Sequence, residues 1–257
     1  MAKWPPFPHA GSYRFDAAGL RQQWARLHTG DAEPLPQDPA VLQAWVLLHN
    51  GAFEQAVQAG LAAGSAGTTV ANKAAAIYAH YLEPQESQRL DLFMEIAQRA
   101  EEQAAQEPAN ANAWYLHAYA LARYGQGISV AKALAQGLGT KTKESLQKAI
   151  ALSPRHADAR IALGAFHARV IDKVGPLIGQ MTYGVHKNIA LQLIQEALRL
   201  HPGSAVAMVE YANALLILEG DGKMEEAHSF YEQAAASTPL DALEHLEVEM
   251  ARLQLAN

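Results

Sequence analysis

Three stretches of the sequence share one pattern and decide the fold. They are E-Q-A-A-Q-E-P-A-N-A-N-A-W (residues 102–114), K-A-I-A-L-S-P-R-H-A-D-A-R (148–160) and E-A-L-R-L-H-P-G-S-A-V-A-M (196–208). In each stretch a helix-forming segment is followed by a proline, and an alanine stands five residues after that proline. Proline cannot continue the preceding helix and is suited to the first turn of the next one. Alanine allows two helices to approach closely where a larger side chain would separate them. The pattern therefore predicts successive pairs of packed helices.

Two less regular copies of the pattern lie at either end of this region. Residues 232–244 keep Pro239 but have Glu244 at the alanine position. Upstream, Pro39 is followed by Ala44 at the same spacing. Together the copies predict a helical-repeat array that extends over most of the chain.

This pattern resembles the tetratricopeptide repeat (TPR) family, in which a helix pair repeats about every 34 residues. The last repeat matches best, at Met208, Tyr211, Ala212, Leu215, Ala227, Tyr231, Ala234 and Pro239. The intervals between the middle prolines exceed the family period by roughly a dozen residues each. The resemblance implies an all-α fold, a right-handed α-solenoid of TPR-like helix pairs with long inserts in two middle repeats.

Four segments follow from this division of the chain. Residues 1–37 are expected to form an N-terminal helix at about 16–28 and a proline-rich lead. Residues 38–107 are expected to form two degenerate repeats, divided at the G-S-A-G of 64–67. Residues 108–238 are expected to form three TPR-like repeats with inserts at about 125–139 and 171–184. Residues 239–257 are expected to form a C-terminal capping helix, because the last apolar face of a repeat array is otherwise exposed to water.

The two inserts are apolar but contain glycines, unlike the short polar turns that usually join paired helices. Thr140 or Thr142 is expected to cap the helix that follows the first insert. Two interpretations of the inserts stay open: they pack as ordinary core, or they line a pocket for a small apolar ligand. The lining residues would be Ile128, Leu134, Leu138, Val174, Leu177, Met181 and Tyr183.

The positions of the inserts narrow the resemblance to one branch of the family. The segments R-Y-G-Q-G-I (123–128), A-L-G (162–164), Y-G (183–184) and E-A-L-R-L-H-P (196–202) are similar to helical-repeat components associated with TRAP-type transporters and to eukaryotic regulators of microtubule dynamics. The similarity covers about residues 102–253. It implies an apolar-lined cleft or the docking of a partner protein. The transporter components are lipoproteins, whereas this sequence has no cysteine that could carry a lipid.

Composition and charge restrict the compartment and the partners. The net charge of −6 gives no indication of nucleic-acid binding, and the absence of cysteine excludes disulfides and thiolate metal sites. No signal peptide or membrane span is predicted, so we expect a cytoplasmic protein. The charge is uneven, and solvated helix faces are its simplest explanation. One region is basic and contains a single acidic residue, Glu144; its basic residues are Arg123, Lys132, Lys141, Lys143 and Lys148. A later region is acidic and contains a single lysine, Lys223; its acidic residues are Glu219, Asp221, Glu225, Glu226, Glu232, Asp241, Glu244, Glu247 and Glu249.

The sequence lacks the motifs of the common catalytic and cofactor sites. The stretch Gly139-Thr140-Lys141-Thr142 departs from the phosphate-binding loop G-x-x-x-x-G-K-[ST], and no strand is predicted before it. The histidines show no metal-binding spacing, and His28, His49, His80 and His201 stand near predicted helix ends, where histidine interacts favourably with the helix dipole. We therefore predict no enzyme activity, no cofactor and no metal.

The predicted function is that of a scaffold that binds a protein or peptide on the concave face of the solenoid. The candidate contacts are Trp114, Tyr115, Arg123, Tyr124, Arg160 and His167. A carrier of a small apolar ligand, bound between the inserts, is the alternative.

Overall fold

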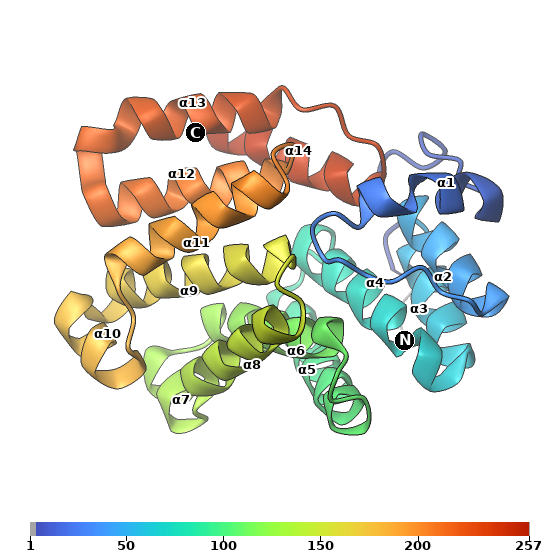
Figure 1. The fold of residues 1–257 in the computed structure, drawn as a ribbon, viewed down its shortest axis with the longest axis horizontal. Helices are drawn as coiled ribbons and strands as arrows, with labels where there is room; N and C mark the ends of the chain where they lie inside the picture. Colours follow the sequence, from blue (N-terminus) through green and yellow to red (C-terminus); the bar gives the residue numbers. More distant parts are fainter. Residues whose placement is uncertain (1–3, 257) are drawn as a thin grey trace. The chain divides into compact units, whose positions relative to one another are not determined.

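The repeat pattern forms a series of α-helices in the computed structural model, which describes residues 4–256 (Figure 1). The described part of the chain contains α-helices and two short 3₁₀-helices and has no strand, which confirms the all-α helical-repeat fold. It divides into two units. Unit 1 comprises residues 4–28, 33–152 and 240–243, and unit 2 comprises residues 29–32, 153–239 and 244–256.

Unit 1 contains a first helix and three helix pairs. The first helix is α1 (Ala17–Leu27), and the pairs are α2 (Pro39–His49) with α3 (Phe53–Ala62), α4 (Thr68–Tyr81) with α5 (Glu86–Gln106), and α6 (Ala111–Gln126) with α8 (Leu138–Leu152). The short α7 (Val130–Ala135) lies in the insert between α6 and α8, and the 3₁₀-helix η1 (Gly64–Gly67) separates the first two pairs. Each helix from α2 to α6 packs against the next along the chain, as expected for an array of repeats.

Unit 2 contains two helix pairs and most of the last helix. The pairs are α9 (Ala157–Val174) with α11 (Lys187–Leu200) and α12 (Ala205–Glu219) with α13 (Met224–Ala235). The insert helix α10 (Pro176–Tyr183) lies between α9 and α11, and η2 (Gly220–Lys223) joins α12 to α13. The final helix, α14 (Ala242–Leu255), belongs to unit 2 from residue 244 onward.

The repeated prolines act differently from the prediction. Pro108, Pro154 and Pro202 do not enter the first turn of the next helix but lie in the turn before it. The side chain two residues later caps the helix instead: Asn110, His156 and Ser204 each accept a hydrogen bond from the backbone N–H of the repeat alanine. The three alanines, Ala113, Ala159 and Ala207, are also completely buried, as the packing argument predicted.

The predicted cap of the helix after the first insert was wrong. Helix α8 begins at Leu138, so Thr140 and Thr142 both lie inside it, and Thr142 is buried. The chain turns at Gly137 instead, which has a φ of +64° that favours glycine. Leu138, the first residue of α8, packs in the core of unit 1.

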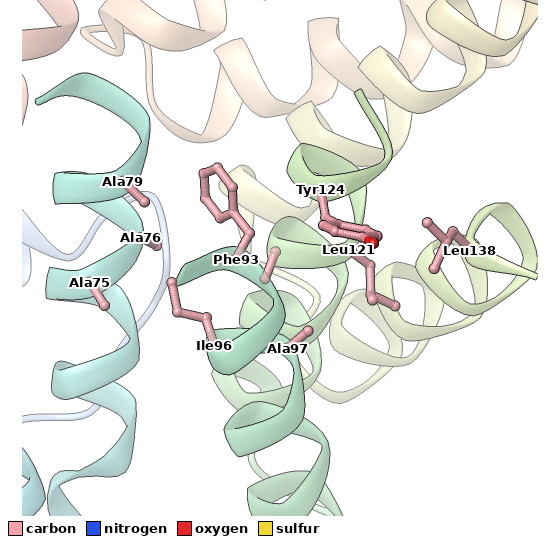
Figure 2. Close-up of a cluster of buried hydrophobic side chains, with 10 residues drawn as sticks. Ala75, Ala76, Ala79, Phe93, Ile96, Ala97, Leu121, Tyr124 and Leu138 are labelled. Carbon is pink, nitrogen blue, oxygen red and sulfur yellow. The ribbon is translucent and has the colours of Figure 1, made fainter. Parts of the chain in front are cut away.

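One hydrophobic core cluster of unit 1 lies between α4, α5 and α6 (Figure 2). Helix α4 presents a flat face of small side chains, Ala75, Ala76 and Ala79, against which Phe93 and Ile96 of α5 pack. Small residues on one helix and large residues on the next allow the layers to interdigitate. The remaining members of this cluster are Ala97, Ala120, Leu121, Tyr124 and Leu138.

A glycine allows a close helix contact in unit 2, and replacing it should destabilise that unit. A Cβ atom at Gly164 of α9 would lie 2.5 Å from Ile194 Cγ1 and 2.8 Å from the Ala190 carbonyl oxygen of α11. We expect Gly164→Val to lower the free energy of unfolding by about 1–3 kcal/mol, because it overpacks this contact. Urea unfolding followed by far-UV circular dichroism, with hydrogen exchange in α9 and α11, measures the effect.

The control is Gly203→Val, because nothing lies within 4 Å of a Cβ atom at Gly203. Equal stability of the two variants would contradict the close contact between α9 and α11.

Candidate functional site

The predicted partner-binding residues of unit 1 lie on α6 and differ in exposure. Trp114, Tyr115 and Arg123 are half-buried, and the indole Nε1 of Trp114 donates a hydrogen bond to the Pro108 carbonyl oxygen (3.1 Å). Tyr124 is 9% exposed and belongs to the core cluster. Tyr115 and Arg123 are therefore the predicted residues in unit 1 whose side chains are best placed to meet a partner.

The predicted partner-binding residues of unit 2 have structural contacts within that unit. Arg160 pairs with Glu196 of α11 (3.4 Å) and donates to the His156 carbonyl oxygen (3.3 Å). His167 is buried, and its Nδ1 accepts a hydrogen bond from the backbone N–H of His186 (3.1 Å). His167 thus helps to fasten the end of the second insert to α9.

The pocket residues predicted in the first insert, which belongs to unit 1, range from buried to exposed. Leu138 is buried, and Ile128 is half-buried against the same core cluster. Leu134 of α7 is 48% exposed, as is Val130 one turn earlier. The base of this insert therefore packs as core, while one face of α7 meets solvent.

The pocket residues predicted in the second insert lie on α9 and α10 of unit 2. Val174 and Tyr183 are half-buried, and the ring of Tyr183 lies edge-on to Phe166 (6.1 Å between centroids). Burial raises the pKa of Tyr183. Leu177 and Met181 are 69% and 80% exposed, which differs from the buried walls of an enclosed cavity. The small-ligand pocket stays a prediction.

A strip of aromatic side chains with an arginine lies across α4 and α6 of unit 1, the first helices of two successive pairs. We call it the aromatic strip; its members are His80, Tyr81, Tyr115, Tyr119 and Arg123, all of them half-buried. The ring of His80 lies 4.3 Å from that of Tyr81 and 6.4 Å from that of Tyr119. Tyr119 in turn lies 6.0 Å from Tyr115. The strip is continuous because α4 and α6 are in contact.

Arg123 ends the aromatic strip with a positive charge. Its guanidinium carbon lies 5.1 Å from the centre of the Tyr119 ring, a cation–π geometry, and its Nη1 donates to Gln126 Oε1 (3.5 Å). A rigid, half-exposed combination of tyrosine and arginine is typical of the residues that dominate protein–protein binding energies. The sequence analysis identified Tyr115 and Arg123 but missed His80 and Tyr81, whose repeat lacks the proline and alanine signal.

Several histidines have contacts in the interior of unit 1. His117 Nδ1 lies 2.9 Å from Ser145 Oγ, and burial lowers the pKa of its imidazole. His28 and His49 are both buried: His49 Nδ1 donates to the Asp241 carboxylate (2.6 Å), and its Nε2 lies 3.3 Å from His28 Nε2. His28 is stacked on Trp24 (4.0 Å). Together, His28, His49 and Asp241 form a buried polar cluster within unit 1.

An N-terminal segment before α1 also packs on unit 1. Trp4 stacks on Tyr78 of α4 (3.9 Å between centroids), and the buried Phe7 meets Phe53 of α3 edge-on (6.2 Å). The Tyr78 hydroxyl donates to Glu83 (2.7 Å), and burial followed by this hydrogen bond raises the pKa of Tyr78. The segment covers apolar surface of the first two helix pairs.

Comparison with known proteins confirms the fold. A solved structure of a thermophilic TPR protein from Thermus thermophilus aligns with a TM-score of 0.58 and 15% sequence identity, over 83% of this chain and 97% of that protein. No family profile and no curated protein matches the sequence. Among the described residues, the helices include none with the length and apolar character needed to span a bilayer. The chain thus has a TPR-like helical-repeat fold.

Proposed function

We propose that this chain is a non-enzymatic scaffold that binds a protein or peptide on the aromatic strip of unit 1. The observation that carries the proposal is the continuity of the strip, which joins the first helices of two successive pairs in one half-exposed surface. Repeat proteins use such extended surfaces, built from equivalent helices of neighbouring repeats, to bind their partners. Tyrosines contribute large contact areas with few rotatable bonds, so their ordering costs little entropy.

The chemistry of the strip favours a partner segment that offers both apolar or aromatic groups and hydrogen-bond acceptors. Tyr115 and Tyr119 present ring faces and hydroxyl groups, while Arg123 presents a guanidinium that can donate to a carboxylate or to backbone carbonyl oxygens. An extended peptide or a helix laid along α4 and α6 would meet all of these groups.

The resemblance to the branch of TRAP-associated components and microtubule regulators is part of the same proposal. It is supported by the positions of α7 and α10, each of which lies between the first and second helices of its pair. We further propose that the scaffold acts in the cytoplasm, in keeping with a sequence that has no cysteine.

Substitution of the strip should abolish capture of the partner. We expect the double variant Tyr115→Ala/Arg123→Ala to bind its partner about 30-fold more weakly or worse, because two such contacts typically contribute about 2 kcal/mol or more. Tagged wild-type and variant chains are incubated with native lysate, and retained proteins are quantified by mass spectrometry. The affinity for the recovered partner is then measured by calorimetry.

The matched control is Gln98→Ala/Glu102→Ala, which removes an exposed polar pair from α5, a second helix of a pair. A partner of the strip is retained by the wild type and by this control but lost by the strip variant. Equal retention by all three chains would contradict the proposal, as would the absence of any stoichiometric partner. Circular dichroism verifies that each variant is folded.

A further inference from the structure

Unit 1 carries an exposed basic surface around α7 and α8 that the proposed function leaves unexplained. Lys132, Lys141 and Lys148 are exposed, and Glu144 is the one acidic residue between positions 123 and 152. Lys141 and Lys148 form no ion pair within the described part of the chain, and Lys132 lies over the ring of Tyr124 (5.7 Å). The positive charge of this surface is therefore not neutralised within unit 1.

Helix α7 also exposes apolar side chains, on the side away from Lys132. Val130 and Leu134 are each 48% exposed and stand four residues apart, which places them on one face of α7. Their backbone is anchored, since Ser129 caps α7 by accepting a hydrogen bond from the Lys132 N–H (3.2 Å). We call this region, Val130 and Leu134 of α7 with Lys141 and Lys148 of the adjoining α8, the basic surface.

Unit 2 carries the opposite charge where α12, η2 and α13 meet. Asp221 and Glu225 are exposed and form no ion pair with any residue that the structure describes. The neighbouring Glu219 and Glu226 are already compensated by lysines, at 2.9 Å and 2.7 Å. The uncompensated negative charge thus belongs to Asp221 and Glu225.

Exposed apolar side chains accompany this negative charge as well. Ile217 at the end of α12 is 38% exposed, and Met224 at the start of α13 is 54% exposed. We call this region, Ile217, Asp221, Met224 and Glu225, the acidic surface. Both surfaces can be located in Figure 1 by the labels α7, α8, α12 and α13.

We propose that the basic surface of one copy of this chain docks on the acidic surface of a second copy. Each surface combines two exposed apolar side chains with charge that its own unit does not neutralise, and the two charges are opposite. Docking removes the apolar groups from water and brings the lysines to the carboxylates, which selects this pairing over contacts between like surfaces. Because the two surfaces differ, the contact is head-to-tail, and each added copy leaves one basic and one acidic surface available.

The pairing with a second copy uses both surfaces, whereas an anionic membrane would use the basic surface alone. An anionic membrane offers no attraction to Asp221 and Glu225, so it would leave the acidic surface unexplained. The contact area offered by the four exposed apolar side chains is small, so the association is weak and depends on electrostatic attraction. Salt should therefore dissociate it.

Reciprocal charge reversal tests the proposal. One variant carries Lys141→Glu and Lys148→Glu, and the other carries Asp221→Lys and Glu225→Lys. Sedimentation velocity of the full-length wild type at low ionic strength should show an average mass that rises continuously with concentration, without a plateau at the dimer, and returns to monomer in high salt. Each reversal variant alone should stay monomeric, since its two surfaces now carry the same charge.

An equimolar mixture of the two variants should associate again, because each surface of one variant meets the opposite charge on the other. A control that reverses charge elsewhere, Glu86→Lys/Asp91→Lys on α5, should associate like the wild type. A wild-type chain that stays monomeric at every concentration in low salt would overturn the proposal, as would reversal variants that associate like the wild type. Binding of a monomeric wild type to anionic phospholipid vesicles, lost in the lysine variant, would assign the basic surface to a membrane instead.

Discussion

Asp241→Ala should lower the free energy of unfolding of unit 1 by about 2–5 kcal/mol, because it leaves a buried donor without its acceptor and removes the residue that precedes α14. The carboxylate of Asp241 accepts a 2.6 Å hydrogen bond from His49 Nδ1, and both side chains are no more than 4% exposed. His49 Nε2 faces His28, so its imidazole has polar neighbours on both sides. Without Asp241, a buried imidazole N–H loses its acceptor and stays desolvated.

Tryptophan fluorescence during urea unfolding measures this loss selectively. The four tryptophans, Trp4, Trp24, Trp45 and Trp114, all lie in unit 1, so the fluorescence transition reports on that unit. Asp91→Ala, an exposed acid on α5, is the control and should change stability by no more than about 0.5 kcal/mol.

A double-mutant cycle separates the hydrogen bond to His49 from other roles of Asp241. The residue directly precedes α14, so its removal can also cost about 0.5–2 kcal/mol as a lost helix cap. Combining Asp241→Ala with His49→Ala isolates their interaction, which we expect to be on the order of 1–3 kcal/mol. Additive losses in the double variant would show that the two side chains do not stabilise unit 1 through each other.

The His49–Asp241 pair marks the limit of what the sequence alone could predict. The two residues are separated by 192 positions, and no local pattern connects them. His28 and His49 were expected to act at helix ends through the helix dipole, and both do stand at helix ends. In the interior, His49 contacts both His28 and Asp241 through its two ring nitrogens. These contacts depend on tertiary packing, which the sequence does not reveal.

The array itself was predictable because its signal is local. A proline and an alanine at fixed spacing report a helix end and a close helix contact, and Ala113, Ala159 and Ala207 are indeed completely buried. The G-S-A-G break is also present, as η1. The capping role of Asn110, His156 and Ser204 was missed, although its signal was there: in all three stretches the residue two positions after the proline can accept a hydrogen bond.

The aromatic strip was predictable only in part. Tyr115 and Arg123 lie on a helix that the repeat pattern identifies clearly, so their exposure could be anticipated. His80 and Tyr81 lie on α4, in a degenerate repeat whose many alanines do not show how it aligns with the other repeats. Their contact with Tyr119 required the packing of α4 on α6, which no sequence pattern specifies.

Phe93→Ala should destabilise unit 1 by about 3–5 kcal/mol, since it removes a large aromatic side chain and leaves a cavity. Phe93 is 2% exposed and is inserted between the alanine face of α4 and helix α6 (Figure 2). The neighbours on α4 are Ala75, Ala76 and Ala79, whose side chains are too short to fill the space that Phe93 would vacate. Collapse of the site would require a shift of α4 towards α5.

Met94→Ala provides the matched control, because it truncates the adjacent residue of α5, which is 39% exposed. We expect it to cost less than about 1 kcal/mol, and Phe93→Leu to fall between the two variants because it retains most of the buried volume. Urea unfolding by tryptophan fluorescence ranks the three. If Phe93→Ala were no more damaging than Met94→Ala, the large side chain would not be holding α4 and α5 together. The complementarity of alanines on one helix and large residues on the next would then not be what stabilises this repeat.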